Sequence, residues 1–358
     1  MSTSKKTTKR VTTRDIAAAC GISQSSVSMI LSHRPGSHFK PETVALVEAT
    51  AEQLGYIYAP RETKADRLKQ TILILCPSLA TDYYVALVRS IAEYAETLGY
   101  FVLVAYTMRD AEREAAYLQM ACRHQMVGAI YTFAPRAISV LKQLDGRLPT
   151  VLISDRNPEL PLPLIELDSA KSGALVAHHL LELGHRHLAY LSGPLTPTEI
   201  PRRRRLAGIR ETCDAAGLPD ALRAFALPED QWLATRSENR QYKTGYALTM
   251  ACFRRGESTT AFIGANDVVA FGCLDALNQL GQHVPEDFSV CGFDNSQEAA
   301  YAGISLTSID HCIDAKGQTA VDILIDQSDH TKPQRYLPRI EYKPQLVIRR
   351  STGPAPKR

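Results

Sequence analysis

Residues 12–31 read TTRDIAAACGISQSSVSMIL and hold two short helical patterns on either side of a glycine. Thr12 is a residue type that caps helices, and Asp15 can reach back to it from three positions later. Gly21 readily adopts the left-handed conformation that ends a helix. Ser23 predicts the cap of a second helix. Two short helices joined by a tight turn indicate a helix-turn-helix.

The second helix, expected over residues 24–31, has one apolar face and one polar face. Its apolar residues recur at helical spacing and are expected to pack inward: Val27, Ile30 and Leu31. The opposite side carries Gln24, Ser25, Ser28 and Met29. A polar outer face suits the major groove of DNA. An ordinary helical hairpin is the alternative interpretation.

A third helix is predicted to begin at Pro41 and to end at Gly55. This helix is expected to complete a three-helix head, and its apolar residues are Val44, Leu46, Val47, Ala51 and Leu54. Residues 1–70 carry eleven Lys and Arg against six Asp and Glu, whereas the rest of the chain carries 30 against 32. A small basic head on a nearly neutral body suggests a nucleic-acid partner for the head.

Residues 12–32, TTRDIAAACGISQSSVSMILS, and residues 41–56, PETVALVEATAEQLGY, resemble the DNA-binding head of the LacI/GalR (lactose-repressor) family of bacterial transcription regulators. The resemblance implies that Gln24 and Ser25, which follow the capping serine, read bases. The family's third reading position, usually Arg or His, is Met29 here, and Met cannot form the bidentate contact with guanine. We expect the DNA contacts to come from Thr13, Ser23, Gln24, Ser25, Ser28, Met29 and His38.

Residues 61–70 are expected to link a head at residues 1–60 to the rest of the chain. In the family, a short hinge helix at this place folds on the operator and inserts a leucine into the minor groove, which bends the DNA. Here that position is occupied by Ala65, and the nearest leucine is Leu68. A plain charged linker is therefore as consistent with the sequence as a hinge helix.

Over residues 71–350, short apolar runs alternate with helical patterns. TILILCP at 71–77 precedes VALVRSIAEYAETLG at 85–99, and YFVLVAY follows at 100–106. Strands that alternate with helices predict parallel sheets covered on both faces. The runs are too many for one sheet, so we expect an α/β body of two doubly wound parallel-sheet lobes, like a periplasmic binding protein, with residues 351–358 as a tail.

Polar side chains follow several of the predicted strands, where ligands bind in folds of this kind. Those expected near a ligand are Tyr83, Tyr84, Asp155, Asn266 and Asp294. Carboxylates and carboxamides can share several hydrogen bonds with hydroxyl groups, which suits a polyhydroxylated ligand. A tyrosine can cover the apolar face of a sugar. Asp267, beside Asn266, is expected to cap a helix instead.

The resemblance to the LacI/GalR family continues through the body, in LELGHRHLAYLSGP at 181–194 and HVPEDFSVCGFDN at 283–295. It implies that Tyr83 and Tyr84 line the effector pocket and that polar contacts come from Asp155, Arg205, Asn266 and Asp294. The neighbouring Arg202–Arg204 are expected to be solvated. Arg240 stands where the family often has an aromatic residue. It either favours a phosphorylated or acidic ligand or is a loop charge in water.

Several classes of protein are excluded by missing motifs. GxGxxG, GxxxxGK[ST] and GxSxG are absent and no catalytic constellation replaces them, so we expect neither an enzyme nor a bound cofactor. The eight cysteines form no CxxC pair, and we expect no metal site. No apolar run reaches the ~18 residues of a membrane span, and no secretory signal precedes the head. We therefore expect a cytoplasmic protein.

Together these features predict a transcription regulator, and more specifically a repressor, that binds a palindromic operator in double-stranded DNA as a homodimer. A small-molecule effector, a sugar or sugar phosphate, is expected to control it by binding one arrangement of the lobes better. The C-terminal residues RRSTGPAPKR have no heptad pattern, so a coiled-coil tetramer is not expected. The alternative is a sugar-binding protein of a transporter, which shares the body but requires a signal peptide and no head.

Overall fold

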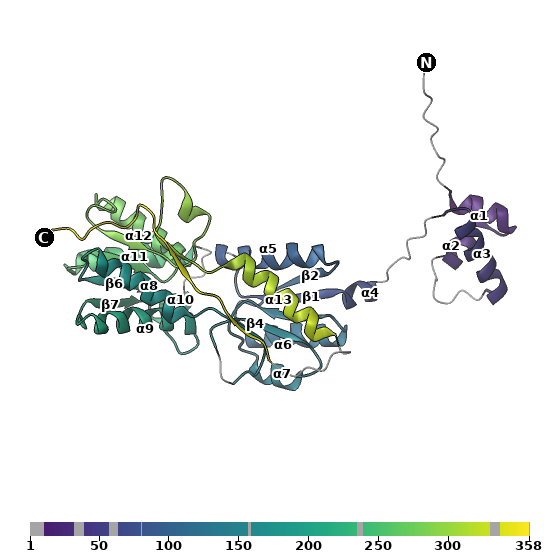
Figure 1. Cartoon of the computed structure of the whole chain (residues 1–358), viewed down its shortest axis with the longest axis horizontal. Coiled ribbons are helices and arrows are strands. Elements are labelled where there is room, and N and C mark those ends of the chain that lie inside the picture. Colours follow the sequence, from purple (N-terminus) through teal and green to yellow (C-terminus); the bar gives the residue numbers. More distant parts are fainter. Residues whose placement is uncertain are drawn as a thin grey trace, which may run out of the picture. The chain divides into compact units, whose positions relative to one another are not determined.

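The computed structural model describes residues 11–31, 39–56, 64–79, 81–156, 159–234, 239–329 and 337–357. These residues belong to two compact units, with the boundary between Arg67 and Leu68. Figure 1 shows the small N-terminal unit of helices and the larger unit that contains the sheets. Each unit has its own buried core, so the packing of each follows from its own residues.

The N-terminal unit packs its helices around one core, as predicted. They are α1 (Thr13–Cys20), α2 (Gln24–Leu31) and α3 (Pro41–Gln53). Gly21 ends α1 with a φ of 67°, and its backbone N–H donates to a carbonyl within α1. Leu46 and Leu54, although apolar, are exposed. The face of α3 that packs inward carries Val47 and Ala51, because neighbouring helices cover only one side of each helix.

The first lobe of the larger unit is a parallel sheet in the order β11-β5-β4-β3-β1-β2. Its strands are β1 (Thr71–Cys76), β2 (Phe101–Tyr106), β3 (Gly128–Tyr131), β4 (Thr150–Ser154), β5 (Leu164–Glu166) and β11 (Arg339–Glu341). Its helices are α5 (Asp82–Thr97), α6 (Ala111–Arg123), α7 (Ile138–Gln143) and α13 (Ile313–Ser328). The continuous apolar run of β1 is buried along its whole length, since one core forms on each face of the sheet.

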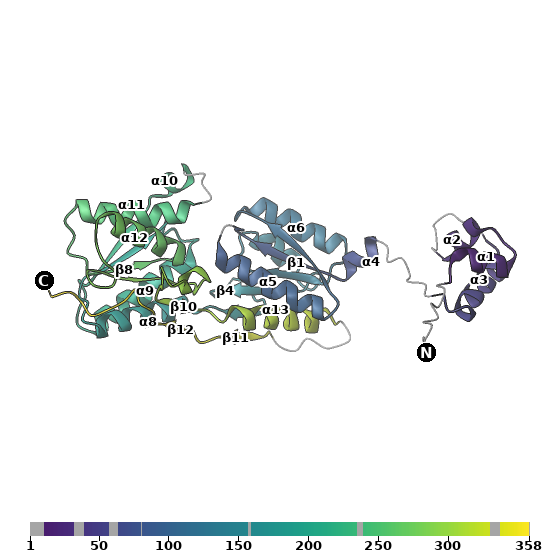
Figure 2. The same ribbon diagram turned by 90° about the horizontal axis from the view of Figure 1, so that it is seen from above.

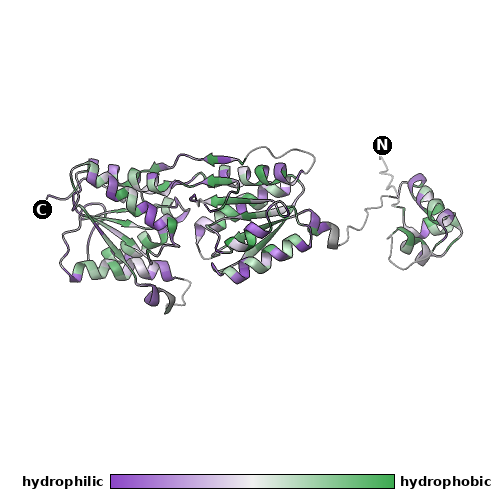
Figure 3. Ribbon diagram, turned by 90° about the horizontal axis from the view of Figure 1, so that it is seen from below, coloured by the Kyte–Doolittle hydropathy of each residue, from purple (hydrophilic) through white to green (hydrophobic). Residues whose placement is uncertain are grey.

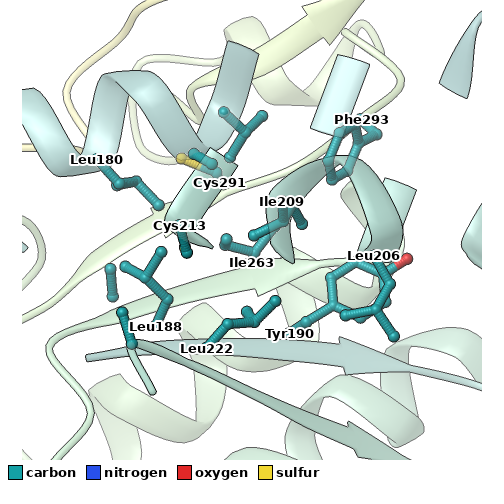
Figure 4. Packing of buried hydrophobic residues seen from close by; sticks show 14 of the residues in the cluster. Leu180, Leu188, Tyr190, Leu206, Ile209, Cys213, Leu222, Ile263, Cys291 and Phe293 are labelled. Atoms are coloured by element: carbon teal, nitrogen blue, oxygen red, sulfur yellow. The ribbon is translucent and has the colours of Figure 1, made fainter. Parts of the chain in front are cut away.

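The second lobe is a parallel sheet in the order β7-β6-β8-β9. Its strands are β6 (Leu188–Ser192), β7 (Leu222–Ala226), β8 (Ala261–Gly264) and β9 (Ser289–Cys291). Its helices are α8 (Ser169–Glu182), α9 (Ile200–Ala215), α10 (Glu229–Ala234), α11 (Arg240–Arg254) and α12 (Asp267–Gln279). Figure 4 shows the core on one face, where Leu206 and Ile209 of α9 meet Tyr190 of β6 and Phe293.

The chain crosses between the lobes in three places: after β5, after β10 (Ser308–Asp310) and after β11. α13 therefore packs beside α5 in the first lobe although it comes from the C-terminal part of the chain (Figures 1 and 2). β10 pairs with β12 (Gln345–Val347) in an antiparallel ladder. Figure 3 shows hydrophobic residues concentrated in the strands and on the helix faces that cover them. Three segments of the chain therefore connect the two lobes.

The expected tail is largely part of the second lobe. Ser351 is buried, and its hydroxyl donates to the carbonyl of Val290 at 2.6 Å. The carbonyl of Gly353 lies 3.1 Å from Nε2 of the buried His185. The backbone N–H of Ala355 donates to the carbonyl of Leu183 at 2.8 Å. These residues were misread because their proline-rich composition hides contacts that only the folded lobe provides.

Two glycines bring α8 and α9 close together. A Cβ added at Gly208 of α9 would lie 1.9 Å from the carbonyl oxygen of Ala170, and one at Gly173 of α8 would lie 2.2 Å from the carbonyl oxygen of Arg205. Such distances exclude any side chain larger than hydrogen without movement of a helix. The close approach sets the position of the N-terminal half of α9, and with it the place of Arg205.

Candidate functional site

Side-chain contacts define where α1 and α2 begin. Ser23 caps α2, because its Oγ accepts a hydrogen bond from the backbone N–H of Ser26 at 3.0 Å. At the start of α1, the carboxylate of Asp15 accepts hydrogen bonds from the backbone N–H of Thr12 at 2.8 Å and from its hydroxyl at 2.7 Å. These contacts fix where the two helices begin, while the packing of Val27, Ile30 and Leu31 into the core determines which residues of α2 face outward.

The outward face of α2 carries the residues predicted to contact DNA. Gln24, Ser25 and Ser28 are exposed, and Met29 is half-buried. Thr13 of α1 joins this face, because Nε2 of Gln24 donates to its Oγ1 at 3.2 Å. His38 lies outside the described residues. An amide and several hydroxyls on one surface are suited to hydrogen bonds with base edges.

A cavity of about 840 Å³ opens between the two lobes of the larger unit, beyond the carboxyl ends of their strands. Residues of both lobes line it, such as Ser78 after β1, Ser154 at the end of β4 and Ala265 after β8. Five residues singled out from the sequence are among them: Tyr83, Tyr84, Arg205, Asn266 and Asp294. A cavity of this size accommodates a small organic ligand.

Arg205 and Tyr83 line this cavity, and each holds a buried polar atom that has no partner among the described residues. Nη1 of Arg205 donates to the carbonyl of Ala265 at 2.5 Å, and its guanidinium lies 4.8 Å from the centre of the Phe293 ring. Nε of Arg205 and the hydroxyl of Tyr83 are buried without a hydrogen-bond partner among the described residues. Leaving buried polar atoms unpaired costs about 1–3 kcal/mol each. Two residues that line the cavity therefore have hydrogen-bonding capacity that the described residues leave unused.

Asp294 is held at the cavity by its backbone. Its N–H donates to Oδ1 of Asp267 at 3.1 Å and to Oγ of Ser308 at 3.0 Å. Burial raises the pKa of the Asp294 carboxyl well above its ordinary value; the carboxylate of Asp267 raises this pKa further, and Arg205 opposes the shift. A carboxyl group with a raised pKa can be protonated and then donates as well as accepts hydrogen bonds.

Asn266, and not Asp267, caps α12. Asn266 both lines the cavity and caps α12, since its Oδ1 accepts from the backbone N–H of Val269 at 3.0 Å. The prediction that Asp267 is a cap was wrong. Asp267 is completely buried and accepts hydrogen bonds from the hydroxyl of Ser308 at 2.5 Å and the backbone N–H of Ser296 at 2.8 Å. It fixes the loop after β9, which is brought to it only by folding.

Asp155 has its partners inside the protein instead of at the cavity. Its Oδ2 accepts from the hydroxyl of Ser169 at 2.8 Å, and its Oδ1 accepts from the backbone N–H of Ser169 at 3.2 Å. Nη1 of Arg204 lies 3.3 Å from Oδ1 of Asp155 and 3.8 Å from Glu166. Arg204 is thus paired instead of simply solvated. Asp155 holds the start of α8, where the chain enters the second lobe.

One wall of the cavity combines arginines with an aromatic ring. Trp232 of α10 is the single tryptophan of the chain. The guanidinium of Arg240 lies 4.1 Å from the centre of its indole ring, and that of Arg202 lies 5.1 Å from it. Nη1 of Arg202 also lies 3.3 Å from Oε2 of Glu199. Arg202 was expected in solvent, and the sequence left open whether Arg240 contacts a ligand or is a loop charge in water. Both line the cavity. Trp232, which lines it with them, was not singled out from the sequence.

The first lobe contributes an arginine to the cavity from an unusual backbone. Met108 and Arg109 follow β2 with φ values of 55° and 57°, in the left-handed region. Non-glycine residues there cost roughly 1–3 kcal/mol and often mark functional sites. Nη2 of Arg109 donates to the hydroxyl of Tyr84 at 2.9 Å, and its guanidinium lies 5.4 Å from the centre of the Phe133 ring. The strand-end position of Arg109 is a signal that could have identified it from the sequence.

The linker is described only from residue 64 onward, where α4 (Lys64–Lys69) begins. Residues 57–63 lie outside the described residues. Leu68, the leucine nearest to the expected wedge position, is partly buried against the core of the first lobe. In this structure Leu68 is therefore a packing residue of the body.

Two absences concern the residues that the structure describes. Within them, no helix is both long enough and apolar enough to cross a membrane. Nor do three or more His, Cys, Asp and Glu side chains gather there in a way that could hold a metal ion.

Known proteins resemble this chain along most of its length. Residues 177–352 match the model of a periplasmic binding protein-like domain. The HTH-type transcriptional regulator DegA of Bacillus subtilis (strain 168) is 27% identical, and the match covers 96% of this chain and 99% of DegA. The crystal structure of the Lac repressor dimer bound to operator and the anti-inducer ONPF is 27% identical with a TM-score of 0.70, and covers 96% of this chain and 100% of that one. A LacI family transcriptional regulator from Enterococcus faecium, crystallised with bound ribose, shares the fold at 24% identity with a TM-score of 0.68, over 79% of this chain and 99% of its own.

Proposed function

The chain belongs to the LacI family of transcription regulators, and from this premise we propose that it binds operator DNA through residues 1–60. A small ligand held between the two lobes of residues 71–350 controls this binding. The proposal makes it a repressor and not an enzyme. It acts where the operator is, in the cytoplasm.

The DNA-binding part of the proposal rests on the outward face of α2. Gln24 and Ser25 lie at the start of this helix, exposed and near Thr13. Side chains at the start of a recognition helix reach base edges in the major groove. Gln pairs naturally with adenine through N6 and N7, whereas Met29 can only offer apolar contact, for example to a thymine methyl group.

The effector part rests above all on Arg205 and Tyr83, which line a cavity of about 840 Å³ and each hold a buried polar atom without a hydrogen-bond partner among the described residues. Together with Asn266 and Asp294 they offer both donors and acceptors, which suits a ligand with several hydroxyl groups. We infer that the effector is a carbohydrate. The ribose bound to the Enterococcus faecium regulator is consistent with this assignment.

Control follows from the position of the cavity between the lobes. A ligand that touches both lobes binds one of their arrangements better and shifts the population toward it. In a dimer, this shift changes how well two heads match the half-sites of a palindromic operator. The coupling free energy in such systems is typically about 1–3 kcal/mol.

The test uses an operator selected from random DNA by the full chain, and a panel of neutral, phosphorylated and carboxylated mono- and disaccharides. We expect at least one compound to change operator affinity, measured by fluorescence anisotropy. Arg205→Ala is expected to lose that response while operator binding in the absence of ligand persists. Arg203→Ala is the matched control, because Arg203 is an exposed residue of the same helix. An equal response in the Arg205 variant and the control would contradict the placement of the site.

The proposed dimer has a candidate surface on β2. This strand is an edge of the first sheet, and its residues Phe101, Leu103, Val104 and Tyr106, with Met108 just beyond, are between 37% and 55% exposed. An exposed apolar edge is a liability unless something covers it. A second copy of the chain would cover it. Leu103→Asp should give a monomer in sedimentation, whereas Tyr301→Asp, at another exposed apolar residue, should leave the dimer intact.

A further inference from the structure

The charges that line the cavity are out of balance. Its lining holds five arginines: Arg109, Arg136, Arg202, Arg205 and Arg240. It holds three carboxyl groups: Glu199, Glu229 and Asp294. Glu229 is exposed, and burial disfavours the ionised form of Asp294. Glu199 is therefore the main counter-charge that this lining offers to its arginines.

Four of the arginines gather around Glu199 and Trp232. Arg202 lies 3.3 Å from the carboxylate of Glu199. The guanidinium groups of Arg202 and Arg240 both lie over the indole ring of Trp232. The negative charge of Glu199 acts to raise the pKa of both Arg109 and Arg240. From the first lobe, Nη2 of Arg136 donates to the hydroxyl of Thr198, next to Glu199, at 3.4 Å.

This arrangement is unfavourable in itself. Within the described residues, no carboxylate comes within 4.0 Å of the guanidinium nitrogens of Arg109, Arg136 or Arg240. Burial and the neighbouring charge of Arg202 lower the pKa of Arg240. Arg202 and Arg240 also stand in the first turns of α9 and α11, where a helix dipole disfavours cations. Such repulsion is relieved if an anion enters the cavity.

We propose that the effector carries an acidic group, a phosphate or a carboxylate, which Arg109, Arg202 and Arg240 receive beside Trp232 while its hydroxyl groups reach Arg205 and Asp294. The inference rests on the proposed function of the cavity. Guanidinium groups match the geometry of both oxyanions and bind them with paired hydrogen bonds. Because Arg109 belongs to the first lobe and Arg202 and Arg240 to the second, one anion neutralises charge on both lobes. Its binding therefore favours their closed arrangement.

The first experiment uses inorganic phosphate as the probe and the full chain as the protein. Phosphate at matched ionic strength should raise the thermal midpoint above that in chloride. Arg240→Gln and Arg109→Gln, in opposite lobes, should each weaken phosphate binding about tenfold or more, whereas Arg240→Lys should retain part of it. Arg203→Gln, an exposed residue of α9 outside the cavity, is the control for loss of one charge. No shift with phosphate, or an equal loss in the control, would overturn the proposal.

The second experiment separates the two acidic groups from each other and from neutral sugars. Glucose, galactose and mannose are each compared with their 6-phosphates and their uronic acids by calorimetry. The acidic member of any set that binds should bind about tenfold or more tightly than the neutral one, and Arg240→Gln should remove that difference. Preference for the 6-phosphate or for the uronic acid identifies the group.

The outcomes distinguish this inference from the proposed function. If a neutral sugar changes operator affinity and the arginine variants respond to it normally, the proposal that the effector carries an acidic group is wrong. The proposed function as a ligand-controlled regulator is then retained. If the arginines bind phosphate but no compound changes operator affinity, the anion site stands and the ligand-controlled regulator is wrong.

Discussion

Three aspartates show how surroundings set the role of one residue type in this protein. Asp155 and Asp267 are enclosed by hydroxyl and backbone donors, so their carboxylates hold loops and helix starts in place. Asp294 is equally buried but faces the cavity, and its carboxyl pKa is raised well above the ordinary value. The first two are structural residues, and the third is free to serve a ligand.

The first prediction concerns the cost of burying Asp294. Because its pKa is raised in the folded state, the folded protein holds this proton more tightly than the unfolded chain does. Its contribution to stability is therefore greatest below the unfolded pKa and is lost as pH rises through the folded pKa. Asp294→Asn should raise the thermal midpoint at about pH 8 by more than at about pH 5, and should also weaken the effector response. The exposed Asp214→Asn is the control; an equal shift at both pH values would contradict the prediction.

The second prediction concerns Gln24 at the start of α2. Gln24→Ala should relax the preference at one base pair in each half-site, at a cost of about 1–3 kcal/mol, because the amide is the group that pairs with adenine. Met29→Arg should shift a neighbouring position toward guanine. Lys9→Ala removes one positive charge and should weaken binding to all DNA sequences about equally. Binding-site selection with each variant is the measurement, and an unchanged motif in Gln24→Ala would show that the assigned reading register of α2 is wrong.

At the scale of elements, paired glycines set how helices of the second lobe pack. Gly173 and Gly208 let α8 and α9 meet with almost no space between their backbones, and Gly245 and Gly272 do the same for α11 and α12. α9 carries Arg202 and Arg205, and α11 begins with Arg240. The close packing of these helices therefore positions the charged wall of the cavity.

The third prediction follows from the first of these pairs. Gly208→Ala places a Cβ 1.9 Å from the carbonyl oxygen of Ala170, so α9 must move. We expect a loss of about 1–3 kcal/mol in the free energy of unfolding, together with weaker effector binding because Arg205 moves with α9. Gly303→Ala, where a Cβ meets nothing within 4 Å, should change neither. Chemical denaturation measures the first effect and ligand titration the second.

At the scale of the whole molecule, the head and the body are separate compact units, with their boundary between Arg67 and Leu68. Each has a core of its own, so each has the means to fold without the other. Regulation then requires that ligand binding in one unit changes DNA binding by the other. Thermodynamics makes this coupling reciprocal.

The fourth prediction tests that coupling in both directions. Operator DNA should change effector affinity of the full chain by the same factor by which effector changes operator affinity, on the order of 5–150-fold. Deletion of residues 1–60 should abolish operator binding and leave a folded body whose effector affinity no longer depends on DNA. Calorimetry on both proteins measures this. A truncated chain that still binds operator would place the DNA-binding surface outside the head.

Much of the architecture could be predicted from local patterns. The caps and the glycine turn locate α1 and α2, and the alternation of apolar runs with helices predicts a parallel α/β body, because spacing and capping depend on near neighbours in the chain. The short strands β5 and β11 and the return of α13 to the first lobe were not predicted. Their positions depend on pairing with distant segments, which leaves little periodicity to detect.

The candidate site divides in the same way. Its general location could be read from the sequence, since polar residues after strands gather at the carboxyl edge of a parallel sheet. Which of them face the cavity depended on tertiary contacts: Ser169 and Arg204 engage Asp155, while Trp232 meets Arg202 and Arg240. These partners lie on different helices, and only the packed lobes bring them within reach. Burial, charge balance and the class of ligand that they favour are therefore properties of the folded body, because each depends on residues far apart in the chain.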